Sequence, residues 1–147
     1  IDNGEPAVLC SHWQGFYDMH DGDRRGFNAF RAVVKRLKGR DPRGENTRWR
    51  TCSEITNYAC AMKMAAIGVD GNSATIELPL QVPETTVRID TPGIKTVAID
   101  GDPLRRVHAK SFFEDGTFWG SDDKTYAAFT PTGRSVALTV ETSTDRP

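Results

Sequence analysis

The chain has 147 residues, of which 37% are hydrophobic and 27% are charged, and its formal net charge is −1. This composition is typical of a soluble globular protein with one domain or two small ones. The near-zero net charge excludes a strong attraction to nucleic acid, and the absence of a long apolar run excludes a transmembrane helix. We therefore expect neither a nucleic-acid nor a membrane partner.

The chain begins at Ile1 rather than at methionine. We therefore expect a processed chain or a fragment of a longer protein, and its localisation, secretion included, stays open.

The first half of the sequence predicts alternating strands and helices. Ala7–Cys10 is a short apolar run of the kind found in a buried parallel strand. Thr47–Thr51 predicts a second short strand, and residues 51–67 predict a helix after it. Between the two strands, residues 26–39 predict a helix whose apolar face consists of Phe27, Phe30, Val33, Val34 and Leu37.

The second half of the sequence predicts strands, because its apolar residues alternate with a period of two. An Asp115-Gly116 pair predicts a hairpin between two of these strands. Short strands separated by regular turns favour a β-sandwich. The predicted strand segments are 73–82, 85–90, 95–100, 105–113, 117–120, 125–130 and 135–142.

The predicted fold class is α+β, with a partial parallel βαβα unit followed by an antiparallel β-sandwich. Helical periodicity stops near Ile67–Asn72, so the predicted domains are residues 1–66 and residues 67–147. Two parallel strands cannot close a barrel, and their apolar flanks need a cover. We therefore expect the sandwich, a second copy in a homo-oligomer, or a missing N-terminal barrel portion to cover them.

The order of the first 66 residues resembles the closing part of the polysaccharide deacetylase superfamily of (β/α) barrels. The resemblance rests on the segments "AVLCSHW", "GFNAFRAVVKRL" and "RWRTCSEITNY". It implies a barrel fragment and places His12 where the family has its catalytic acid histidine. The family's early Asp and its His-x-x-x-His metal pair have no counterpart in this chain.

The resemblance thus implies a carbohydrate-active protein that binds a polysaccharide or oligosaccharide. As an enzyme it would be a deacetylase-like hydrolase, and it would deacetylate only if the missing metal-site residues were supplied elsewhere. In that case His12 would protonate the leaving group.

Two groups of residues are candidates for contacting sugar. Aromatic rings stack on the apolar faces of sugars, and nearby polar groups can fix hydroxyls. The first group follows His12 and consists of Trp13, Gln14, Tyr17 and Asp18. The second group, Trp119 and Tyr126, lies near turns of the predicted sandwich and suggests a non-catalytic carbohydrate-binding module as an alternative.

A further alternative is a small His-ligated metalloenzyme that acts on polysaccharide. His12, His20 and His108 are the three histidines of the chain, and Asp21 and Asp23 add carboxylates. Nitrogen and oxygen donors of this kind suit a divalent transition metal. The spacing matches no known metal motif, so no residue is assigned as a ligand and the cofactor stays open.

Overall fold

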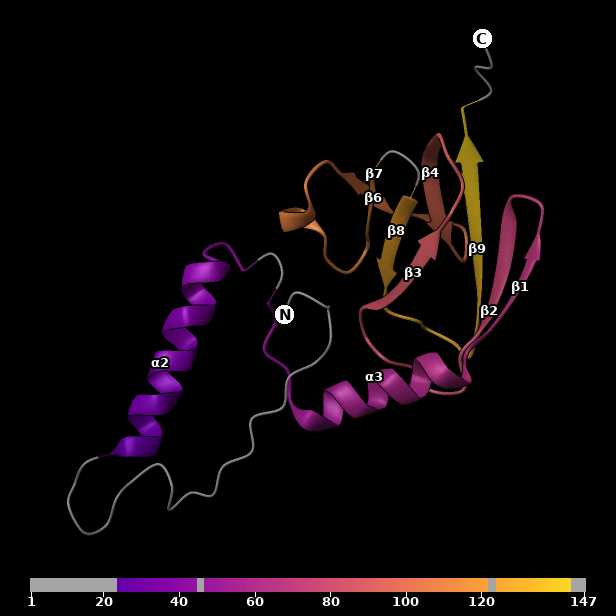
Figure 1. Cartoon of the computed structure of the whole chain (residues 1–147). Coiled ribbons are helices and arrows are strands. Elements are labelled where there is room, and N and C mark those ends of the chain that lie inside the picture. The colour runs from indigo at the N-terminus through magenta and orange to yellow at the C-terminus, as the bar shows by residue number, and fades with distance from the viewer. Residues whose placement is uncertain (1–23, 45–46, 122–123, 144–147) are drawn as a thin grey trace. The chain divides into compact units, whose positions relative to one another are not determined.

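The computed structural model describes residues 24–44, 47–121 and 124–143 (Figure 1). The chain divides into two compact units, Ile1–Cys52 and Ser53–Pro147. His12 and the other predicted residues before position 24, together with the predicted strand Ala7–Cys10, lie outside the described residues.

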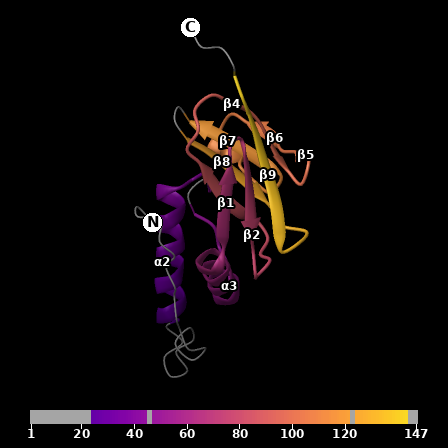
Figure 2. The ribbon, with the colours of Figure 1, turned by 90° about the vertical axis from the view of Figure 1, so that its right-hand side faces the viewer.

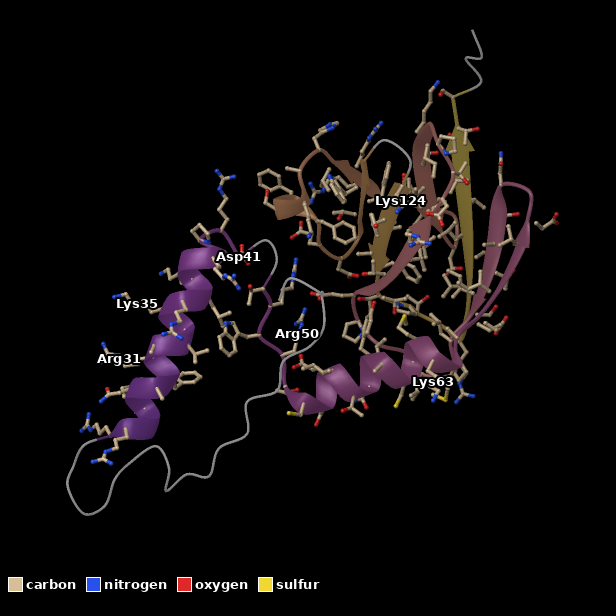
Figure 3. All side chains as sticks on the ribbon, in the orientation of Figure 1. Arg31, Lys35, Asp41, Arg50, Lys63 and Lys124 are labelled. Atoms are coloured by element: carbon tan, nitrogen blue, oxygen red, sulfur yellow. The ribbon has the colours of Figure 1, made fainter. Side chains whose placement is uncertain are left out.

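The first unit contains the helix α2 (Arg25–Arg40), which confirms the helix predicted over residues 26–39. Its exposed side carries Arg31 and Lys35 (Figure 3). Lys38 and Arg40 lie in the last turn, where positive charge offsets the negative end of the helix dipole. The five apolar residues of the predicted face are all partly buried: Phe27, Phe30, Val33, Val34 and Leu37.

The predicted strand at Thr47–Thr51 is wrong, because the backbone there is neither strand nor helix. Its one large apolar residue, Trp49, contacts the ring of Phe30 edge to face at 6.2 Å between centroids and is 60% exposed. Arginines and threonines occupy the other positions, so the segment lacks the apolar run of a buried parallel strand. The described residues accordingly contain no parallel βαβα unit and no barrel fragment.

The second unit begins with the helix α3 (Cys52–Met64), which confirms the second predicted helix. Ala61 is fully buried, and Met62 packs against the core between the sheets. The hydroxyl of Tyr58 accepts a hydrogen bond from the backbone N–H of Thr86 at 3.3 Å. The helix therefore lies across one end of the two sheets and belongs with them structurally (Figure 1).

Within the described residues of the second unit, nine strands form two sheets (Figure 2). All pairings are antiparallel except that of β6 with β7. The first sheet has the order β1 (Ala66–Asp70), β2 (Ser73–Glu77), β9 (Ser135–Thr142), β4 (Ile94–Ile99) and β5 (Asp102–Pro103). The second has the order β3 (Thr85–Ile89), β8 (Lys124–Phe129), β7 (Thr117–Ser121) and β6 (Arg105–Val107).

One apolar core joins the two sheets. The fully buried Val97 and Val136 come from the first sheet, and Phe118 and Phe129, which are 3% exposed, come from the second. Each is flanked along its strand by residues that point to the other face, as the period of a strand requires. Two mostly antiparallel sheets packed face to face in this way are the sandwich that the alternating pattern predicted.

The hairpin predicted at Asp115-Gly116 is also wrong. The strand predicted over 105–113 ends at Val107, and a short 3₁₀ helix (Lys110–Phe112) follows. The Oγ1 of Thr117 donates to the carbonyl of Glu114 at 2.7 Å and accepts from its N–H at 3.0 Å, which holds a tight turn before β7. The chain therefore re-enters the sheet in its original direction, and β7 pairs with β6 in parallel.

The core gives a direct test of stability through two leucines that are two positions apart. Leu78 is 1% exposed, whereas Leu80 is 40% exposed. We expect Leu78→Ala to lower the free energy of unfolding by about 2–5 kcal/mol, because it leaves a cavity in the core. The matched change Leu80→Ala should cost less than about 1 kcal/mol. Urea denaturation of both variants measures the difference, and equal losses would contradict the described core.

The unit boundary gives a second test. The boundary predicted near Ile67–Asn72 and the division at Ser53 differ by one helix, α3. Because α3 packs on the core, we expect subtilisin to cut first in the segment 41–52 and to leave a stable fragment that contains α3 and the strands. Mass spectrometry identifies the first cut. A stable fragment that begins within residues 67–72 would instead support the boundary predicted from the sequence.

Candidate functional site

Trp119 and Tyr126 form a pair of aromatic side chains on the second sheet. They are directly opposite each other in the register of β7 and β8. Their ring centroids are 5.8 Å apart and their planes differ by 21°. Each residue is partly buried, so part of each side chain is open to solvent. We call these two residues the aromatic pair.

The core determines the direction in which the aromatic pair points. Phe118 precedes Trp119 on β7, and Ala127 follows Tyr126 on β8, and both are buried in the core between the sheets. Successive side chains of a strand point to opposite faces, so Trp119 and Tyr126 lie on the outer face of the second sheet. Burial of the neighbouring residues thus keeps two large rings at the surface.

The strands on either side of the aromatic pair give it one apolar and one charged flank. Val107 on β6 is the register partner of Trp119 and is 5% exposed. Arg88 on β3 is the register partner of Tyr126. Its guanidinium lies 2.9 Å from the carboxylate of Asp90, and both side chains are 56% exposed. Across the four strands, the buried Val107, the two rings and the exposed ion pair follow one another in that order.

This arrangement suits a flat, partly apolar ligand with hydroxyl groups. The two rings are stacked, and the part of each ring that is open to solvent can contact the apolar face of a sugar, because aromatic rings attract polarised C–H groups. The guanidinium of Arg88 donates hydrogen bonds, and the carboxylate of Asp90 accepts them. An ion pair this exposed contributes little to stability, so its groups can exchange partners with a ligand at small cost.

The sequence named Trp119 and Tyr126 together as one candidate group, and the structure places them opposite each other as a cross-strand pair. It did not name Arg88 or Asp90. The alternation in "TTVRID" carries the signal that could have found them, because Val87 and Ile89 pack against the core and Arg88 lies between them.

The metal-binding alternative depends mostly on residues that lie outside the described part of the chain, His12 and His20 among them. His108 is exposed and directly follows β6. Over residues 24–44, 47–121 and 124–143, no group of three or more His, Cys, Asp and Glu side chains is placed to hold a metal ion. The possible divalent transition metal therefore stays a prediction.

Trp13, Gln14, Tyr17 and Asp18 were predicted to contact sugar near His12, and they also precede the described residues. Their grouping around His12 remains a prediction from the sequence. Within the described part of the chain, the helices are too short or too polar to cross a membrane.

Comparison with known proteins assigns no relationship. No family model matches the sequence, and no curated protein matches it. The likeness to polysaccharide deacetylases therefore rests on the sequence segments alone.

Proposed function

We propose that this protein binds carbohydrate through the aromatic pair on the outer face of the second sheet. The observation that carries the proposal is the pairing of Trp119 with Tyr126, two partly exposed rings 5.8 Å apart on adjacent strands of a rigid sheet. Such a surface matches the flat apolar face of a pyranose ring, and binding sites placed on strands need little ordering when the ligand arrives.

Charge at one end of the row supports a polyhydroxylated ligand rather than a purely apolar one. Arg88 and Asp90 lie on the β3 side of Tyr126 and offer both donors and acceptors. Sugar hydroxyls both donate and accept, so they can bridge a guanidinium and a carboxylate. The ion pair of Arg88 and Asp90 would orient a sugar that the rings of the aromatic pair hold by stacking.

The sequence resemblance supports the same ligand class from a separate direction. Residues 7–58 contain the segments that resemble polysaccharide deacetylases, whose substrates are carbohydrates. The finer proposal is a binding protein derived from the closing part of such a barrel. Deacetylation would then require that another chain or a missing N-terminal portion supply the metal ligands, with His12 as the acid.

Truncation of the aromatic pair tests the proposal. We expect Trp119→Ala and Tyr126→Ala each to lose about 1.5–3 kcal/mol of apolar contact, which weakens oligosaccharide binding roughly 10- to 100-fold. Tyr126→Phe keeps the ring and should bind nearly as well as the parent. Titration calorimetry against acetylated and free oligomers of glucan, xylan and chitin measures the affinities.

Phe112→Ala is the matched control, because Phe112 is 66% exposed and lies in the 3₁₀ helix rather than in the aromatic pair. Its affinity should equal that of the parent. Circular dichroism of each variant checks that the fold is retained. If the parent binds an oligomer and Trp119→Ala binds it equally well, the aromatic pair is not the site.

His12 tests the deacetylase-like alternative. If His12 is the acid implied by the resemblance, His12→Ala should abolish release of acetate from acetylated oligosaccharides while leaving binding at the aromatic pair unchanged. His20→Ala should retain the activity. An acetate assay with and without added divalent metal separates the alternatives, and a parent protein without activity under both conditions would leave binding as the sole proposed function.

A further inference from the structure

The strand β1 is an outer edge of the first sheet (Figure 1), and it exposes apolar side chains. Ile67 is 60% exposed and Val69 is 75% exposed. Ile67 is the register partner of Ile76, whose side chain is buried in the core, so Ile67 and Val69 lie on the core-facing side of the sheet. The described residues of the second unit therefore leave one edge of the core open.

The other three sheet edges carry features that prevent pairing with another chain. The strand β5 is two residues long and includes Pro103, which has no N–H to donate. The strand β6 has three residues, and two of them are Arg105 and Arg106. On β3, the N–H of Thr86 is bonded to the hydroxyl of Tyr58. Short strands, proline, charge and a covering element are the usual protections of an edge strand.

The strand β1 lacks the proline and the positive charges of these other edges, and all five of its residues are exposed. It has five residues without lysine, arginine or proline, and its pairing with β2 runs without a bulge from Ala66 to Asp70. Its register with β2 fixes which backbone groups are free. Gly71 and Asn72 form the two-residue turn of the hairpin, so the closing pair Asp70–Ser73 exchanges hydrogen bonds and the pairs then alternate. The N–H and C=O groups of Ile67 and Val69 consequently point away from β2.

Gly68, the central residue of β1, has no requirement within its own chain. Its φ angle is not positive, and a Cβ atom added to it would meet nothing within 4 Å. Glycine in a strand interior weakens the strand, and it often marks a place where another backbone approaches closely. Neither the space around Gly68 nor its backbone conformation therefore requires glycine within the described residues.

We propose that two copies of this chain pair antiparallel through β1, with the two Gly68 residues on the twofold axis. In this register Ile67 faces Val69 of the second copy, and each of these pairs exchanges two backbone hydrogen bonds. The Gly68 residues then form the central pair without hydrogen bonds, where the Cα atoms of an antiparallel ladder approach to about 4.5 Å. The two five-stranded sheets become one continuous sheet.

Charge at the two ends of β1 is complementary in this arrangement. Lys63 lies in the last turn of α3, just before β1 begins (Figure 3). Asp70 is the exposed last residue of β1. Antiparallel pairing brings the start of one strand to the end of the other, so Lys63 of each copy approaches Asp70 of the second copy. The contact is confined to one strand, so the dimer is expected to exchange with monomer.

The first experiment measures association of the full chain by sedimentation velocity over a range of concentrations. The parent should shift from monomer to dimer as concentration rises. Val69→Lys places a cation in the pairing edge and should weaken the dimer at least tenfold. Thr139→Lys is the matched control, because Thr139 is exposed on β9, an inner strand of the same sheet, and should leave the dimer intact.

A cysteine cross-link tests the register itself. In a chain with Cys10→Ser, Cys52→Ser and Cys60→Ser, the change Gly68→Cys should give a disulfide-linked dimer under mild oxidation, because disulfides need Cα atoms about 4.4–6.8 Å apart. Thr75→Cys, opposite Gly68 on β2, should remain monomeric in the same assay. A parent that stays monomeric at every concentration, a dimer that Val69→Lys leaves unchanged, or equal cross-linking of both cysteine variants would each overturn the proposal.

Discussion

The rest of the structure depends on burial of one face of each sheet in a shared core. Val136, Leu138 and Val140 on the central strand β9 pack toward the second sheet, where Phe118 and Phe129 face them. Because strand side chains alternate, a shift of one residue in register would move the buried side chains of a strand to the solvent face and disrupt the core. The core therefore determines both which residues are buried and which reach solvent.

Both proposals follow from this constraint, on different surfaces. On the second sheet, burial of Phe118 and Ala127 directs Trp119 and Tyr126 outward, and Arg88 on the next strand is the register partner of Tyr126. On the first sheet, the hairpin of β1 and β2 extends the core-facing surface to an edge where Ile67 and Val69 are exposed. If both proposals hold, a dimer carries two sugar sites, and a polymeric ligand that reaches both is bound with avidity.

Local patterns in the sequence predicted the helices and strands that depend on the spacing of nearby apolar residues. The apolar spacing of Phe27, Phe30 and Leu37 predicted the helix α2, and alternation predicted most of the strands. Thr47–Thr51 was misassigned because one tryptophan among arginines and threonines resembles an alternating strand, although the segment is not a strand of either described sheet. Asp115-Gly116 was misread because a turn signal does not state whether the chain reverses or crosses to a parallel position.

The candidate site was predictable only in part, because its geometry depends on pairing between distant segments. Trp119 and Tyr126 could be named as aromatic residues near turns, but the register that places them opposite each other is a long-range property of the sheet. Arg88 joins them from a strand more than thirty residues earlier, since β3 pairs with β8. The residues around His12 precede the described part of the chain and stay predictions of the resemblance.

The central claim is that the outer face of the second sheet is a carbohydrate-binding surface. An NMR titration of the isotopically labelled protein with an oligosaccharide that it binds tests this claim most directly, because the titration locates the contact without any substitution. The account predicts that the largest shifts fall on the indole N–H of Trp119 and on backbone amides of β7, β8 and the Arg88 segment of β3. Shifts confined to other strands, or to the segment around His12, would contradict it.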